Sequence, residues 1–142
     1  WTSPVPPTTL PPTLQSDYPV LACMTVQWNS NNQVEECVTN IYLLDDGKMR
    51  YNFTWTAKLD TGATVEVTSS LGNSNMYLLD NLGNRYDALQ VGDGAAQTTI
   101  LRDGDILSGW FLFPAAVDEA MYFLFYDDDN GVQTPKIDRV WP

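Results

Sequence analysis

The sequence predicts an all-β fold of roughly nine strands, arranged as a β-sandwich or a closed β-barrel. The clearest evidence is the segment Met49 to Leu59, in which apolar and polar residues alternate. This period of two is typical of a strand that buries one face. Short apolar segments recur along the chain, separated by turn sequences rich in Asp, Asn and Gly. No long segment has the spacing of an amphipathic helix, and only Ala115 to Ala120 has room for a helical turn.

Each expected strand is bounded by turn-forming residues. The segments Val20 to Trp28 and Val34 to Leu44 flank the polar cluster Asn29 to Asn32 and therefore predict a hairpin. The turn Asp45 to Gly47 then leads into the alternating strand. Further strands are expected between similar turns, at residues 64–69, 75–79, 85–89, 97–101, 106–113 and 121–126, with 136–140 as a candidate last strand. This spacing favours a sandwich or a closed barrel.

The N-terminal segment differs from the rest in composition. Residues 1–15 contain five prolines and five Thr or Ser residues and no charge. Proline fixes φ and lacks an amide donor, so such a segment favours extended conformations. We therefore expect residues 1–16 to form a linker, or a stalk that holds the domain away from a membrane or cell wall, and residues 17–142 to form the sandwich. Because the chain starts at Trp1, we also expect a processed targeting segment or a tether upstream.

The charge balance excludes several classes of partner and chemistry. The 142 residues include 18 Asp and Glu against 7 Lys and Arg, which gives a net charge of −11, and there is no histidine. Nucleic acid and anionic lipid both require a basic surface, so neither is an expected partner. No apolar segment is long enough for membrane insertion. Without histidine, the usual general base and the Ser-His-Asp and Cys-His arrangements are missing.

Carboxylates remain as the candidates for catalysis. The acids expected inside strands are Glu35, Glu36 and Glu66, and the first two are adjacent, so they point to opposite faces of the sheet. Glycoside hydrolysis needs two carboxylates that face one cleft. The sequence therefore predicts a protein that is not an enzyme.

Cys23 and Cys37 lie on opposite arms of the expected first hairpin. The centre of its turn falls near residue 30, so positions 23 and 37 face each other. We expect a disulfide between them, which would contribute about 3 kcal/mol by the chain-entropy model. Two buried free thiols are the alternative. Two cysteines without histidine do not make a zinc site.

The acidic turns suggest one metal hypothesis. Asp127, Asp128 and Asp129 stand together before Asn130 and Gly131, and calcium prefers such oxygen ligands. The same residue types are selected by ordinary β-turns, which is the alternative interpretation. Calcium is therefore the single cofactor hypothesis, and otherwise no cofactor is expected.

Exposed tryptophans provide a hypothesis for ligand binding. Trp28 ends the first strand of the hairpin, and Trp110 alternates with Phe111, so one of these two faces solvent. An exposed indole offers a large flat apolar face for a ligand. Trp28 and Trp110 are the candidate ligand-binding residues, and a protein or a cell-surface polymer is the candidate partner.

The turn Asp80, Gly83 and Tyr86 matches a D-x-x-G-x-x-Y hairpin, and a second group of positions follows it at Gly104, Gly109, Phe111, Phe113 and Pro114. In this order of strands and turns, residues 34–128 resemble the DUF4352 family of telokin-like, immunoglobulin-type extracellular domains of bacterial lipoproteins and surface proteins. The resemblance implies that the all-β fold is an immunoglobulin-like antiparallel β-sandwich of about eight to nine strands. It also implies a secreted or cell-surface location and no catalytic residues.

Together these observations predict a non-enzymatic extracellular module that binds a partner or builds a surface. One alternative is a subunit of a surface filament or layer that assembles through edge strands. Another is an accessory domain that binds carbohydrate or calcium.

Overall fold

A computed structural model describes residues 14–67, 76–139 and 141, and it confirms the all-β fold. The described strands are β1 (Leu14–Gln27), β2 (Gln33–Leu44), β3 (Met49–Lys58), β4 (Thr64–Val67), β5 (Met76–Asp80), β6 (Arg85–Asp87), β7 (Gln90–Asp93), β8 (Thr99–Arg102), β9 (Ile106–Phe113), β10 (Tyr122–Asp127), β11 (Val132–Gln133) and β12 (Ile137–Asp138). All of their pairings are antiparallel.

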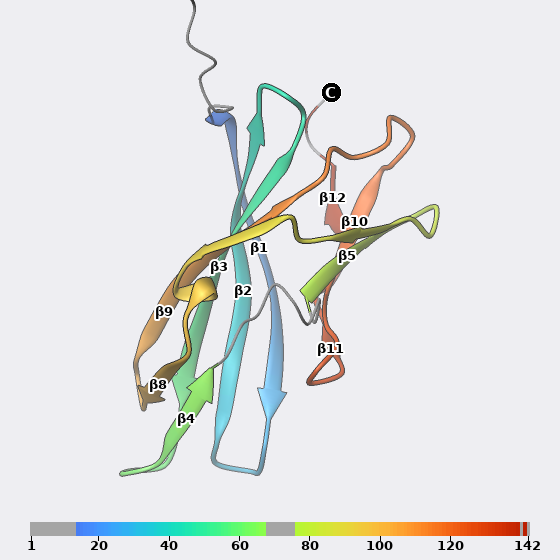
Figure 1. The fold of residues 1–142 in the computed structure, drawn as a ribbon. Coiled ribbons are helices and arrows are strands. Elements are labelled where there is room, and N and C mark those ends of the chain that lie inside the picture. Colours follow the sequence, from blue (N-terminus) through green and yellow to red (C-terminus); the bar gives the residue numbers. More distant parts are fainter. Residues whose placement is uncertain (1–13, 68–75, 140, 142) are drawn as a thin grey trace, which may run out of the picture.

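The strands form two main sheets and one small one (Figure 1). The first sheet has the order β1-β2-β3-β9-β7. The second sheet has the order β11-β10-β5-β6, with β12 also paired to β10. Strands β4 and β8 pair separately. In Figure 1 the long strands β1, β2 and β3 run the length of the molecule, and β5, β10 and β12 lie beside them.

Several expected boundaries differ from the structure. The described residues form twelve strands against the expected eight to nine, and the short strands β7 and β11 have no counterpart among the expected ones. Strand β1 begins at Leu14, three residues before the expected domain start at 17. The expected strand over 97–101 is preceded by β7 and a short 3₁₀-helix, η2 (Gly94–Ala96). Residues 115–120 contain no helix. The Pro/Thr-rich residues 1–13 lie outside the described part.

Aromatic side chains fill the space between the two main sheets. The alternation predicted for β3 is confirmed, since Tyr51, Phe53 and Trp55 are buried while their neighbours are only half-buried. Phe125 of β10 stacks on Phe53 with ring centroids 5.0 Å apart. It also meets Phe111 of β9 at 5.5 Å. These contacts join strands of opposite sheets, so the layers form a sandwich with an aromatic core.

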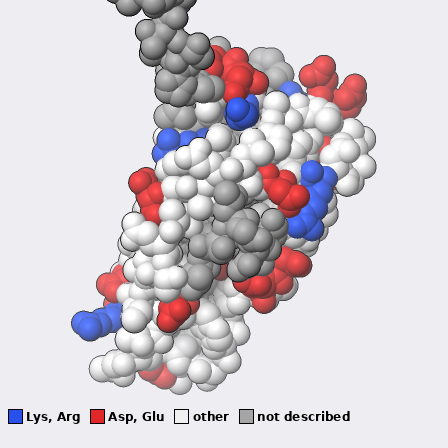
Figure 2. All heavy atoms as spheres, in the orientation of Figure 1, with Lys and Arg blue, Asp and Glu red and all other residues white. Residues whose placement is uncertain are grey.

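The acidic residues lie mostly in turns, as the sequence indicates. Figure 2 shows them as separate groups scattered over the visible face. Their carboxylates often accept backbone hydrogen bonds: Asp46 from Lys48, Asp103 from Leu59 and Asp105 from Arg102. Such bonds are the reason that turns select Asp. Among the described residues, no helix has the length and apolar character needed to cross a membrane.

Candidate functional site

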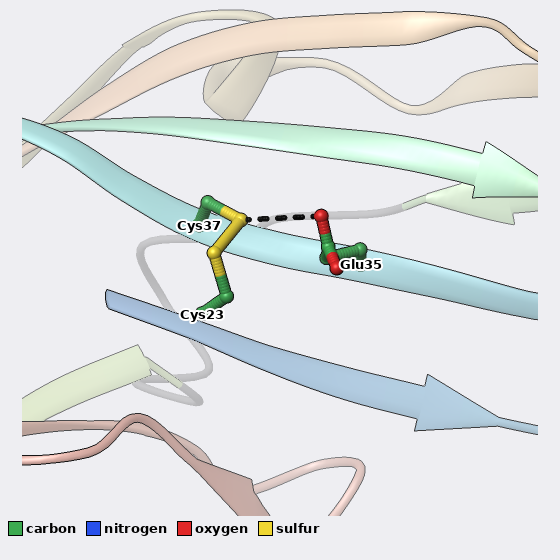
Figure 3. Close-up of side chains that lie close together, drawn as sticks. All are labelled: Cys23, Glu35 and Cys37. Atoms are coloured by element: carbon green, nitrogen blue, oxygen red, sulfur yellow. Dashed lines mark hydrogen bonds between the residues drawn. A yellow bond between two sulfur atoms is a disulfide. The ribbon is translucent and has the colours of Figure 1, made fainter. Parts of the chain in front are cut away.

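The Cys23–Cys37 disulfide joins β1 to β2, as predicted. The two cysteines are direct partners in the antiparallel register, so the hairpin itself brings their Cβ atoms together. Figure 3 shows the bond between the two strands, with Glu35 beside it on β2. Cys37 is 6% exposed. The disulfide therefore links the edge strand β1 covalently to its neighbour β2.

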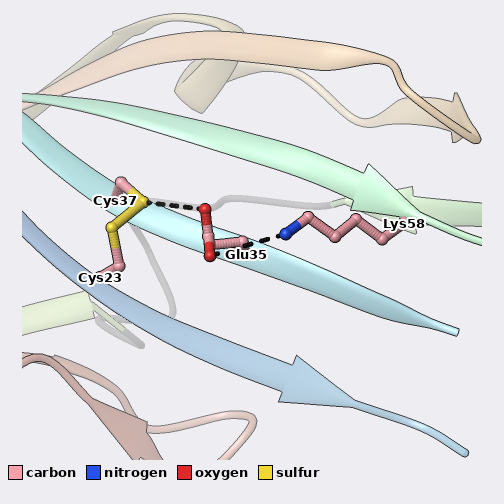
Figure 4. A network of polar contacts seen from close by, with 4 residues as sticks. All are labelled: Cys23, Glu35, Cys37 and Lys58. Atoms are coloured by element: carbon pink, nitrogen blue, oxygen red, sulfur yellow. Dashed lines mark hydrogen bonds and ion pairs between the residues drawn. A yellow bond between two sulfur atoms is a disulfide. The ribbon is translucent and has the colours of Figure 1, made fainter. Parts of the chain in front are cut away.

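The disulfide is flanked by a surface ion pair. One carboxylate oxygen of Glu35 lies 3.7 Å from Cys37 Sγ. The other lies 3.9 Å from Lys58 Nζ on β3 (Figure 4). A disulfide sulfur carries no proton, so the first contact is an approach of two acceptors and not a hydrogen bond. Cys23, Glu35 and Cys37 would also have the spacing of a metal site, but the disulfide withholds both thiolates as ligands.

The side chains of the three predicted calcium ligands do not point to the same place. Asp127 ends β10 and is buried, at 4% exposed, whereas Asp128 and Asp129 are exposed in the following turn. The Asp127 carboxylate accepts hydrogen bonds from the backbone and side-chain amides of Asn130, at 3.3 and 2.8 Å. Within the described residues, these three carboxylates do not gather into a group that could hold a metal ion together. Asp127 instead faces the interior of the sandwich.

A second acid meets Asp127 inside the sandwich. Glu36 of β2 is 3% exposed and hydrogen-bonds the Asp127 carboxyl group across the two sheets. Burial is the main cause that raises the pKa of Glu36 to about 10, and the hydrogen bond to Asp127 and its negative charge act in the same direction. Glu36 is therefore protonated near neutral pH. Its Oε2 atom has no hydrogen-bond partner.

This interior acid pair was not predicted. The sequence does place Glu35 and Glu36 on opposite faces, which the structure confirms, because Glu35 is half-buried on the outside and Glu36 is in the core. No local pattern pairs Glu36 with a residue that the sequence assigns to a surface turn.

The two candidate tryptophans lie far apart. Trp28 is 50% exposed in the β1–β2 turn, next to the row formed by Gln27, Gln33 and Lys58. Trp110 is half-buried on the outer face of β9 and pairs with Asn52. Asn52 and Lys58 are separated by about six residues, or roughly 20 Å, along β3. Trp28 and Trp110 therefore do not form one ligand site.

Trp110 belongs to a cluster on the outer face of the first sheet, the Arg50 cluster, which consists of Tyr42, Arg50, Asn52 and Trp110. The Arg50 guanidinium carbon is 4.7 Å from the centre of the Trp110 ring and 5.9 Å from that of Tyr42. Arg50 Nε donates a hydrogen bond of 3.2 Å to Asn52 Oδ1. Gly92 of β7 lies beneath the Trp110 indole, and a Cβ there would overlap the ring. Glycine thus lets the indole lie close to the sheet.

The second sheet carries a similar cluster, the Arg85 cluster, formed by Tyr77, Arg85, Asp87 and Tyr126. The Arg85 guanidinium carbon is 3.8 Å from the centre of the Tyr77 ring, and Tyr77 stacks on Tyr126 at 5.1 Å. Arg85 Nε donates to Asp87 Oδ1 at 2.8 Å. Here the arginine has an ionic partner two residues away on its own strand.

The D-x-x-G-x-x-Y residues have a structural role. Gly83 adopts a φ of +87°, which suits glycine at this turn. The Asp80 carboxylate accepts hydrogen bonds from the backbone amides of Leu82 and Asn84 and from the Tyr86 hydroxyl, at 2.8, 2.9 and 2.8 Å. Burial raises the pKa of Asp80, but the hydrogen bonds from Asn84, Tyr86 and Leu82 outweigh it and lower the pKa overall. This motif holds the β5–β6 turn.

Comparison of the chain with protein-family models, with curated proteins and with solved structures gave no match.

Proposed function

We propose that this chain is a non-enzymatic, extracellular β-sandwich module of a secreted or cell-surface protein, which binds a partner or builds that surface. The observation that carries the proposal is the Cys23–Cys37 disulfide. Structural disulfides persist in oxidising compartments such as the periplasm and the cell exterior and are rare in the cytosol. The resemblance to telokin-like extracellular domains points to the same location.

The arrangement of the acids supports a module without catalysis. Glu36, whose pKa is strongly raised, lies in the core and is only 3% exposed. A shallow depression lies between the turns at Thr61–Thr64 and Arg102–Asp103. Its one carboxylate, Asp103, already accepts the backbone amide of Leu59 at 2.9 Å. Catalysis by acid and base needs a titratable group within reach of a substrate.

Thiol counting tests the proposed location. The chain should be recovered from cells that produce it naturally, denatured without reductant, and labelled with a thiol reagent. We expect no free thiol, and a C23A/C37A variant serves as the blank. Two free thiols per chain in the natural material would contradict an extracellular location.

Assembly through edge strands remains an alternative proposal. Strand β1 is fourteen residues long and forms an edge of the first sheet. Leu21 on this strand is 79% exposed. However, Pro19 and a register shift between Pro19 and Ala22 interrupt the strand, and such features oppose strand addition. Light scattering over a concentration series would separate the two cases, since a monomer at every concentration excludes assembly by this chain alone.

A further inference from the structure

We infer that the Arg50 cluster binds a sugar bearing a single carboxylate, as one unit of an otherwise uncharged glycan. The inference rests on the proposed binding role and names the ligand class and its site. Both rows of the site are set by strand register. Tyr42, Arg50 and Leu112 form one row across β2, β3 and β9, and Asn52 and Trp110 form the next.

Among the described residues, the charge of Arg50 has no ionic partner. All 18 Asp and Glu residues lie in the described part of the chain. The four ion pairs found there involve Lys48, Lys58, Arg85 and Lys136. Arg50 is half-buried and takes part in none of these four pairs, and its Nε donates to the neutral side chain of Asn52 instead. Asp17 is the closest acid by register, one strand beyond Tyr42, and its carboxylate accepts a hydrogen bond from Asn40.

The guanidinium is held in place with its terminal nitrogens still available. Nε donates a hydrogen bond to Asn52 at 3.2 Å, and the guanidinium carbon lies over the Trp110 and Tyr42 rings. No hydrogen bond from the two terminal nitrogens to a described residue is found. These nitrogens present the parallel N–H pair that matches a carboxylate with two hydrogen bonds. The positioning lowers the entropy lost when an anion binds.

The surroundings of Arg50 favour a sugar over a small inorganic anion. Trp110 contributes a flat aromatic surface next to the charge. Leu112 and Trp110 are half-buried, and Gln90, which pairs with Leu112, is exposed on β7. Apolar surface with a few polar groups is the usual lining of a ligand site. A sugar acid has a carboxylate for Arg50, ring faces for the aromatic groups and hydroxyls for the amides.

The overall charge limits how acidic the glycan is. A net charge of −11 repels a polyanion. At physiological ionic strength the screening length is about 8 Å, so an isolated carboxylate at Arg50 is affected mainly by its immediate neighbours. A single charged unit is therefore preferred over a continuous polyanionic chain.

The test is an NMR titration of the isotope-labelled protein with sodium D-glucuronate, glucose and sodium acetate at about 150 mM salt. We expect glucuronate to shift the Trp110 indole and Arg50 Nε signals with millimolar affinity. Glucose and acetate should each bind at least about tenfold more weakly, because each supplies half of the interaction. Equal binding of acetate and glucuronate would mean an adventitious anion only and would overturn the inference.

Three variants locate the site. R50Q removes the positive charge of the site. N52D gives Arg50 a carboxylate partner of its own, as Asp87 is for Arg85. Both variants should therefore weaken glucuronate binding at least about tenfold. R85Q is the matched control and should leave binding unchanged. If R50Q proves unfolded, the N52D variant provides the test, because it keeps Arg50 and an acceptor for its Nε. Unchanged binding in N52D, or no binding by the wild type at tens of millimolar glucuronate, would overturn the inference. Neither result bears on the thiol count that tests the extracellular location.

Discussion

The two main sheets differ in how their polar groups are partnered. In the second sheet, Asp80 and Asp127 accept hydrogen bonds from the turns that follow them, and Arg85 is paired with Asp87. In the first sheet, Glu36 Oε2 and the Tyr51 hydroxyl are buried without a partner, and Arg50 has a neutral amide in place of a carboxylate. A buried group without a partner costs stability. We therefore expect pH and ligands to change the stability of the first sheet most, whereas the polar groups of the second sheet already have partners within the protein.

The largest expected effect comes from Glu36. Its pKa is about 10 in the folded protein against an ordinary value of 4.5. The stability that it contributes is therefore complete below about pH 4.5 and is lost as the pH rises toward 10. The free energy of unfolding should fall by up to about 1.4 kcal/mol per pH unit in this range. Denaturant unfolding at pH 5, 6.5 and 8 measures this slope.

Two variants sharpen that result. E36Q keeps a donor for Asp127 without a titratable proton, so its stability should vary much less with pH. E35Q is the matched control on the outer face, where an exposed ion pair contributes about 0.5 kcal/mol at most, and it should keep the wild-type slope. A wild type and an E36Q variant with the same slope would contradict a protonated Glu36.

Loss of the disulfide should have the next largest effect. Because the bond restricts the unfolded chain, the C23A/C37A variant should unfold with about 3 kcal/mol less free energy than the oxidised wild type. Urea unfolding of both proteins at pH 5 provides the measurement. A reduced wild type, which keeps both sulfurs, is the control for packing. Equal midpoints for the oxidised and reduced forms would mean that the bond does not stabilise the first sheet.

The second sheet should respond at the Asp80 turn. D80A leaves the Tyr86 hydroxyl and the Leu82 and Asn84 amides without their acceptor, which should cost about 2 kcal/mol. Because the folded pKa of Asp80 is lowered, its contribution is present at neutral pH and is lost as the pH falls below about 4. The difference between D80A and wild type should therefore shrink in acid. A difference that stays constant down to pH 3 would argue against an ionised Asp80.

The smallest expected effects on stability test the two arginine clusters directly. N52D gives Arg50 an ionic partner, and D87N removes the partner of Arg85. Exposed pairs of this kind contribute less than about 1 kcal/mol, so N52D should be slightly more stable than wild type and D87N slightly less. Thermal melts at low and high salt measure both changes, and salt should diminish each of them. A destabilising N52D and a stabilising D87N would contradict the difference between the two sheets.

The sequence predicts what depends on local order. Alternation in Met49–Lys58 identifies the buried aromatic row, and the turn between residues 28 and 33 sets the register that joins Cys23 to Cys37. The calcium hypothesis for Asp127 to Asp129 is equally local, and the inward direction of Asp127 emerges only in the fold. Trp28 is exposed and Trp110 is half-buried on an outer face, as local alternation allows, but the distance between them depends on sheet geometry.

The remaining features depend on which strands become neighbours. Glu36 meets Asp127 because β2 and β10 face each other across the core, 91 positions apart in the chain. Arg50 meets Trp110 because β9 inserts between β3 and β7. Pairing of distant strands is not encoded in the period or the turn residues of either one. For that reason neither the Glu36–Asp127 pair nor the Arg50 cluster could be found by inspection of the sequence.

The difference between the sheets is tested most directly by the carboxyl carbon signals of the folded protein in a ¹³C NMR pH titration. The account predicts one glutamate carboxyl signal that stays protonated at pH 7 and is missing in E36Q. It also predicts that the Asp80 carboxyl titrates below its ordinary range. If every glutamate titrates near its ordinary value of 4.5, the acid pair between the sheets does not share a proton, and the account is contradicted.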